Sequence, residues 1–298
     1  MDKVLTTPDG ACLRVREWPC ERARGTVHLV HGLGEHVGRY KALAERLNEQ
    51  GWRVVGHDQR GHGRSDGARG RLPAADTLLR DLAQVMDAVR TARGGPRVLL
   101  GHSLGGLIAA RFVAEGLQDR SADWHRGVDA LVLSSPALDA GMNPLQKLAL
   151  ALLGPVAPNL AVANGLDAAW LSRDTAVVQA YRDDPLVHDR IAPRLARFIV
   201  DAGEDVLVLA PRWRVPTLLL WAGSDRCVAP RGSAAFAAAA PAGVVTATVF
   251  EPLFHEIFNE PEREQVLGHL DAWLDLRFAA AAPRSADLHS PPPMRRSA

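Results

Sequence analysis

The stretch Gly101-His102-Ser103-Leu104-Gly105 decides the fold. It follows the apolar run 97–100 and precedes apolar residues at helical spacing over 107–113. A serine flanked in this way at a strand-to-helix turn is typical of an exposed nucleophile on a strained backbone. Small residues two positions before and after the serine let the turn pass its neighbours. The N-terminus of the helix that follows favours negative charge beside Ser103.

Two later strand ends supply the partners that such a serine needs. A serine hydroxyl is a weak nucleophile until a base removes its proton. After this kind of turn the partners follow in the order acid, then histidine. Asp225 follows the apolar run 217–221, and His255 follows the run 246–250. We therefore predict His255 as the base and Asp225 as the acid that orients it.

Several nearby side chains offer other interpretations. Glu251 and Glu256 are alternative acids, and we expect His102 to point away from the base position. The polar segment 57–65 lacks a familiar zinc-ligand spacing, so we interpret it as a loop fixed by its own hydrogen bonds and ion pairs. Cys227 either approaches the pocket or is a small buried apolar residue, and the latter is favoured.

The tetrahedral intermediate of acyl transfer needs two backbone N–H donors. The residue after the nucleophile, Leu104, is one candidate. The early turn His31-Gly32-Leu33-Gly34 is the other, because glycines on both sides let the N–H of Leu33 turn inward. We predict Leu33 and Leu104 as the oxyanion hole, although the turn at His31 is also explained by shape alone.

Apolar runs and helical patterns alternate along most of the chain. Continuous apolar runs indicate strands that are buried on both faces, and their alternation with helices predicts a doubly wound, mostly parallel sheet. The runs cover 26–30, 52–56, 97–101, 130–133, 217–221 and 246–250, with an alternating run at 12–18. The main helical patterns cover 43–47, 78–89, 107–113, 145–152, 195–209 and 266–274, the last with Pro261 in its first turn.

The rhythm breaks between residues 136 and 212. This segment shows no clear strand, and an unstructured loop of that length is uncommon in a compact domain. We predict a helical cap insertion at 136–212, lying over the sheet edge where ligands bind. The α/β core is then 1–135 and 213–278. The tail 279–298 is rich in Ala, Pro, Ser and Arg, and we expect it to be disordered.

Composition excludes several classes of protein. Lys plus Arg is 35 and Asp plus Glu is 34, so we expect no nucleic-acid partner. Three widely spaced cysteines do not form a disulfide framework, and the first residues lack the apolar run of a secretory signal. We therefore expect a cytoplasmic protein without a metal or other cofactor. Its oligomeric state is open.

Six motifs lie at 31–36, 58–63, 101–106, 184–187, 223–225 and 255–261. Together they resemble the monoacylglycerol lipase and lysophospholipase family of α/β-hydrolases, which is serine aminopeptidase S33-like. The resemblance runs from about residue 26 to about 275. It implies the α/β-hydrolase fold and hydrolysis of an ester with a fatty acyl chain and a small polar alcohol.

The leading hypothesis is a serine hydrolase that cleaves carboxylic esters through an acyl-enzyme. The family places the acyl chain under the cap, and the cap of this chain is rich in leucine and valine over 145–162. That surface also leaves open a transient contact with a membrane. A thioesterase, an acyltransferase or a peptidase would use the same triad. A non-catalytic ligand-binding protein of this fold is the alternative from another class.

Overall fold

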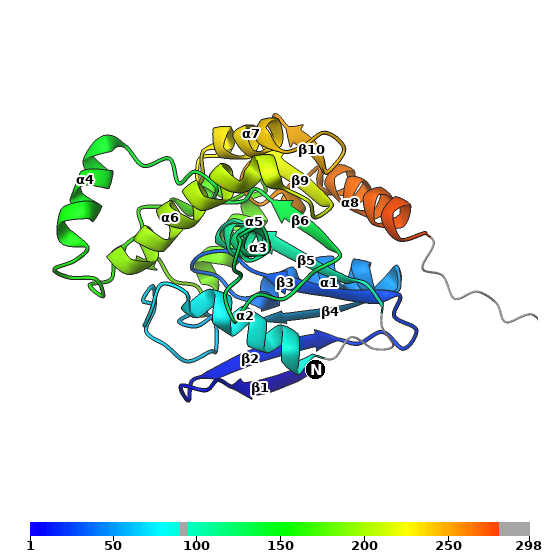
Figure 1. Ribbon diagram of the computed structural model, residues 1–298, viewed down its shortest axis with the longest axis horizontal. Helices are drawn as coiled ribbons and strands as arrows, with labels where there is room; N and C mark the ends of the chain where they lie inside the picture. The colour runs from blue at the N-terminus through cyan, green and yellow to red at the C-terminus, as the bar shows by residue number, and fades with distance from the viewer. Residues whose placement is uncertain (90–94, 280–298) are drawn as a thin grey trace, which may run out of the picture.

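An eight-stranded sheet forms the centre of the computed structural model, which describes residues 1–89 and 95–279 (Figure 1). The strand order is β1-β2-β4-β3-β5-β6-β9-β10, with β2 antiparallel to β1 and β4 and the other pairs parallel. This confirms the predicted fold class. The strands are β1 (Asp2–Thr6), β2 (Cys12–Trp18), β3 (Gly25–Val30), β4 (Trp52–His57), β5 (Arg97–His102), β6 (Ala130–Ser134), β9 (Thr217–Ala222) and β10 (Val245–Phe250).

The central strands are mainly apolar because helices cover both faces of the sheet. Every residue of β3, β6 and β9 is buried. One apolar layer packs the sheet against α1 (Lys41–Glu49) and α8 (Arg263–Phe278). The other packs it against α2 (Thr77–Ala88), α3 (Leu104–Glu115), α6 (Pro193–Leu209) and α7 (Pro230–Ala239).

Helices make up most of the regular structure between β6 and β9. The division into a core and a cap at 136–212 stays a prediction. Pro193 is the first residue of α6, where a proline fits because its missing N–H has no intrahelical acceptor. Figure 1 shows α4 projecting from the body beyond one end of α6. The segment contains α4 (Pro144–Leu153), β7 (Val162–Ala163), η3 (Ala168–Trp170), α5 (Thr175–Asp183), β8 (Arg190–Ile191), α6 and η4 (Ala210–Arg212).

The structure also contains elements that the sequence pattern did not predict. Strands β7 and β8 form a two-residue antiparallel pair, which is too short to leave a periodic signal. Helix α7 is alanine-rich, and Phe236 is its one large buried side chain, so no amphipathic stripe marks it. Pro261 precedes the last helix rather than lying in its first turn, because α8 begins at Arg263. Apart from Ala279, the tail 279–298 lies outside the described residues.

Candidate active site

Ser103 occupies a strained turn between β5 and α3. Its backbone torsion angles are φ 54° and ψ −121°, in a region that side-chain-bearing residues rarely adopt. Such a conformation costs about 1–3 kcal/mol and persists only where the surroundings fix it. Here the N–H of Ser103 donates to Ser134 O at 3.0 Å, and Ser103 O accepts from the N–H groups of Leu107 and Ala137, each at 3.0 Å.

Two glycines allow this turn to pack. A Cβ atom on Gly101 would lie 2.3 Å from Gly105 O, and one on Gly105 would lie 2.1 Å from Val30 O. Both distances are far below van der Waals contact with backbone atoms that cannot move aside. The close approach of the turn to β3 therefore requires glycine on either side of Ser103.

His255 and Asp225 form a buried hydrogen-bonded pair. His255 Nδ1 lies 2.7 Å from Asp225 Oδ2, and the two side chains are 4% and 1% exposed. Asp225 Oδ1 accepts the backbone N–H groups of Cys227 at 2.8 Å and Val228 at 3.1 Å. These bonds fix the carboxylate in the loop after β9, while His255 lies in the loop after β10.

The surroundings of His255 favour its protonated form. Burial lowers the pKa of this imidazole, but the charge of Asp225 and the hydrogen bond to it, with Glu256 and Glu35, outweigh burial. The net result is a pKa above the usual value of 6.5. An imidazole with such a pKa is suited to take a proton from a hydroxyl and to hold it for a leaving group.

The alternative acids have other places. Glu251 is exposed at the end of β10, and the carboxylate of Glu256 pairs with Arg39.

The expected orientation of His102 is wrong, because its ring centroid lies 4.7 Å from that of His255. His102 is the last residue of β5, so its side chain reaches the same sheet edge. Burial lowers its pKa to about 3, which keeps the ring neutral.

Leu33 and Leu104 line the same cavity as Ser103. Leu104 is the first residue of α3, and the N–H there has no acceptor within the helix. The side chain of His31 fixes the turn at Leu33. Its Nε2 accepts the N–H of Gln59 at 2.9 Å, and its Nδ1 lies 2.8 Å from Gly32 O. The oxyanion hole at Leu33 and Leu104 stays a proposal that this placement supports.

Two cavities meet at Ser103. The larger, of about 620 Å³, extends beneath α4 and α6 and has mainly apolar walls. The smaller, of about 390 Å³, has walls that are about as polar as they are apolar, and most of the residues that line it are polar or charged. Cys227 lines the larger one, and burial raises the pKa of its thiol. Apolar residues of the larger cavity include Ala137, Met142, Leu150, Val162, Ile191, Ile199 and Val228, and polar residues of the smaller include Glu35, Arg39, His102, Asn164, Asp167 and Asp184.

The polar segment 57–65 is a loop fixed by its own contacts, as we interpreted it. Asp58 accepts the backbone N–H groups of Val37 at 3.0 Å and Arg64 at 2.9 Å. Arg60 is buried and forms ion pairs with Asp81 and Asp9. These side chains hold the loop against the body rather than facing Ser103.

Potential metal-ligand atoms lie close together at the pair formed by His255 and Asp225. Among the described residues, Asp225, Cys227 and His255 place donor atoms within 4.8 Å of one another. Two of these atoms, His255 Nδ1 and Asp225 Oδ2, already share the 2.7 Å hydrogen bond. The arrangement therefore fits an acid–base pair.

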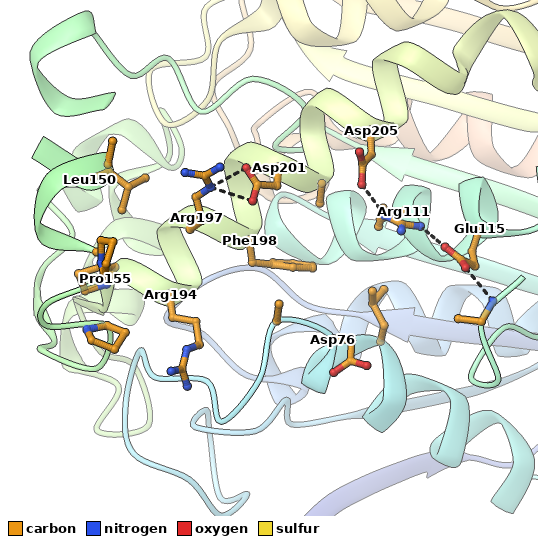
Figure 2. Close-up of a pocket in the computed structure, with 18 of the residues that line it drawn as sticks. Asp76, Arg111, Glu115, Leu150, Pro155, Arg194, Arg197, Phe198, Asp201 and Asp205 are labelled. Atoms are coloured by element: carbon orange, nitrogen blue, oxygen red, sulfur yellow. Dashed lines mark hydrogen bonds and ion pairs between the residues drawn. The ribbon is translucent and has the colours of Figure 1, made fainter. Parts of the chain in front are cut away.

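A separate pocket of about 510 Å³ lies between α2, α3, α4 and α6 (Figure 2). Most of its charged side chains pair with one another: Arg111 with Glu115 and Asp205, and Arg197 with Asp201. Asp76 pairs with Arg80, and Arg194 donates to Leu72 O. Ser103 is not among the residues that line it. Its charges are thus engaged within the protein.

The comparison with known proteins covers both the sheet and the segment above it. Residues 21–262 match the family described as "Serine aminopeptidase, S33". A monoacylglycerol lipase of Mycolicibacterium smegmatis is 36% identical over 262 residues, which cover 84% of this chain and 88% of that protein. An uncharacterized abhydrolase domain-containing protein of Dictyostelium discoideum is 33% identical over 281 residues and 93% of this chain, which spans 29% of that protein's length.

A solved structure has the same arrangement. The crystal structure of a monoacylglycerol lipase from Paleococcus ferrophilus matches with a TM-score of 0.79 and 35% sequence identity. The match covers 89% of this chain and 99% of that one.

The Asp225→Asn substitution tests the histidine–aspartate pair. It removes the charge that orients His255, so we expect kcat to fall by about 10⁴-fold. Because burial then dominates, the pKa of His255 falls, and the acid limb of the kcat/KM profile moves to lower pH. Steady-state kinetics on a p-nitrophenyl ester measures both. The control is Asp205→Asn, at an ion pair on α6 outside both cavities, and a wild-type kcat for Asp225→Asn would contradict the assignment.

Proposed function

We propose that this chain, which belongs to the serine aminopeptidase S33 family, hydrolyses monoacylglycerols with a triad of Ser103, His255 and Asp225. It is a carboxylic-ester hydrolase of the monoacylglycerol lipase and lysophospholipase type. The strained turn, the buried histidine–aspartate pair and their common sheet edge support this assignment. The substrate is thus a small-molecule ester.

The proposed reaction has two half-reactions, formation of the acyl-enzyme and its hydrolysis. Ser103 Oγ attacks the ester carbonyl while His255 Nε2 accepts its proton, and the N–H groups of Leu33 and Leu104 bind the oxyanion. Collapse of the intermediate breaks the C–O bond, and His255 protonates the departing alcohol. Water, deprotonated by His255, then attacks the acyl-enzyme, which releases the fatty acid and returns the proton to Ser103.

The observation that carries the substrate class is the contrast between the two cavities at Ser103. A monoacylglycerol joins a long apolar chain to a small polar alcohol at the ester carbon. The apolar cavity of about 620 Å³ suits the chain, and the more polar cavity of about 390 Å³ suits glycerol. A substrate that is polar or apolar at both ends would fill one of them poorly.

A series of 1-acylglycerols from acetyl to stearoyl tests the proposal. We expect kcat/KM to rise with chain length while methylenes enter the apolar cavity, at roughly 0.8 kcal/mol, or about fourfold, for each methylene buried. Acyl thioesters and peptide p-nitroanilides serve as comparison substrates. A sharp optimum at acetyl, or faster cleavage of thioesters or peptides than of every acylglycerol, would contradict it.

We also propose that α4 and the loop after it contact a lipid surface. Among the described residues, no helix is long and apolar enough to cross a membrane. The apolar side chains here are nevertheless exposed: Leu145 by 76%, Leu148 by 55%, Leu152 by 65%, Val156 by 83% and Leu160 by 62%. Exposed apolar side chains that recur along one projecting segment support an interaction site there.

Flotation with phosphatidylcholine vesicles tests this contact. The wild type should float with the vesicles, and the double variant Leu148→Asp, Leu152→Asp should bind at least about 10²-fold more weakly, since each buried leucine contributes roughly 1.5–3 kcal/mol. The control is Leu276→Asp, at an 85% exposed leucine on α8. Equal flotation of all three proteins would contradict the proposal, as would a wild type that stays in solution as a dimer.

A further inference from the structure

One largely buried arginine joins the two loops that flank Ser103. Arg39 lies in η1 (Val37–Tyr40), just after the turn that contains Leu33. Its Nη1 donates to Glu35 Oε2 at 2.7 Å and to Glu256 Oε1 at 2.6 Å, and its Nη2 donates to Glu256 Oε2 at 2.8 Å. Arg39 and Glu256 are 217 positions apart in the sequence. We call Glu35, Arg39 and Glu256 the bridge cluster.

Each carboxylate of the bridge cluster is fixed to one loop. Glu35 Oε1 accepts the backbone N–H of Gly32 at 2.6 Å, one residue before the proposed oxyanion donor Leu33. It also accepts the hydroxyl of Tyr40 at 2.6 Å. A movement of Glu35 would therefore displace the turn that carries the donor.

On the other side, Glu256 directly follows His255. Its Oε2 accepts the side-chain amide of Asn259 at 2.8 Å, and its backbone N–H donates to Leu171 O at 2.8 Å. Glu256 therefore holds the loop that carries the base. Arg39 binds this carboxylate through two parallel N–H···O bonds, the arrangement that gives the strongest geometric definition.

Burial makes the arginine indispensable to this arrangement. The side chains of Glu35 and Glu256 are each 5% exposed, and that of Arg39 is 12% exposed. Two buried carboxylates without a cation between them would repel each other and lose their solvation. One guanidinium serves both, so the two loops are held at a fixed separation.

We propose that Arg39 is a positioning residue that sets the oxyanion turn and the His255 loop at the distance required by the reaction at Ser103. The inference rests on the triad proposed above. Arg39 touches the insertion as well, because its guanidinium lies 4.8 Å from the ring centroid of Tyr181 on α5. The contact ties the segment above the site to the same cation.

The bridge cluster also sets the charge beside the base. His255 faces Asp225, Glu256, Glu35 and the neutral ring of His102, and the carboxylates together raise its pKa. Burial opposes ionisation of Glu256, but the charge and hydrogen bonds of Arg39 lower its pKa and keep it anionic. Loss of this anion would favour neutral His255.

The test compares Glu256→Gln and Arg39→Lys with the wild type on a short p-nitrophenyl ester across a pH series. Glutamine keeps the size of the side chain without its charge, and lysine keeps the charge without the two-pronged contact. We expect kcat to fall on the order of 10²-fold in each, the size associated with a displacement of about 1 Å, at nearly unchanged KM. In Glu256→Gln the acid limb of kcat/KM should also move to lower pH.

The matched control is Glu115→Gln, which removes a buried carboxylate paired with Arg111 outside both cavities at Ser103. It should keep the wild-type kcat and pH profile. The rate at which a fluorophosphonate phosphonylates Ser103 is measured on the folded fraction of each variant. The comparison therefore stays valid for a variant that folds poorly.

The outcomes separate the two proposals. Slower phosphonylation of both variants than of Glu115→Gln supports the positioning role. Equal rates with an unmoved acid limb would overturn it and leave the triad intact. A folded wild type that resists the reagent would instead overturn the triad, and with it the role of Arg39.

Discussion

The turn at Ser103 is the constraint on which the rest of the structure depends. The chain passes from β5 to α3 through a positive φ of 54°, with backbone atoms too close to Gly101 and Gly105 for any side chain. Hydrogen bonds from β6 and the loop after it fix that turn. The same turn directs the serine to the end of the sheet, where both cavities open. The position of the turn is therefore the reason that the two cavities meet at Ser103.

Electrostatics divides the surrounding polar groups by function. Burial lowers the pKa of His102 to about 3 and that of His31 well below its usual range, so both remain neutral structural groups. His255 is equally buried but faces carboxylates, and its pKa moves in the opposite direction. The difference is the direct hydrogen bond between His255 and Asp225, because Asp225 and Glu256 also act on His102 without outweighing its burial. The neighbours of His255 therefore suit it to the role of the proposed base.

Much of this arrangement is predictable from local sequence. Asp225 and His255 each follow an apolar run, and parallel strands bring such ends to one edge. The apolar stripe and Pro193 predict the long helix 195–209. No local pattern predicts the contact between Arg39 and Glu256, because packing between distant loops decides it and neither residue belongs to a periodic pattern. The orientation of His102 was missed for a similar reason, since it depends on what fills the space above β5.

Reaction of the folded protein with a fluorophosphonate, followed by digestion and mass spectrometry of the peptides, tests directly whether Ser103 is the nucleophile. We expect one adduct, on the peptide that contains Ser103, and none in a folded Ser103→Ala variant. An adduct that persists in Ser103→Ala would place the nucleophile elsewhere. A folded wild type that stays unmodified would contradict the catalytic account and favour a ligand-binding protein of the same fold.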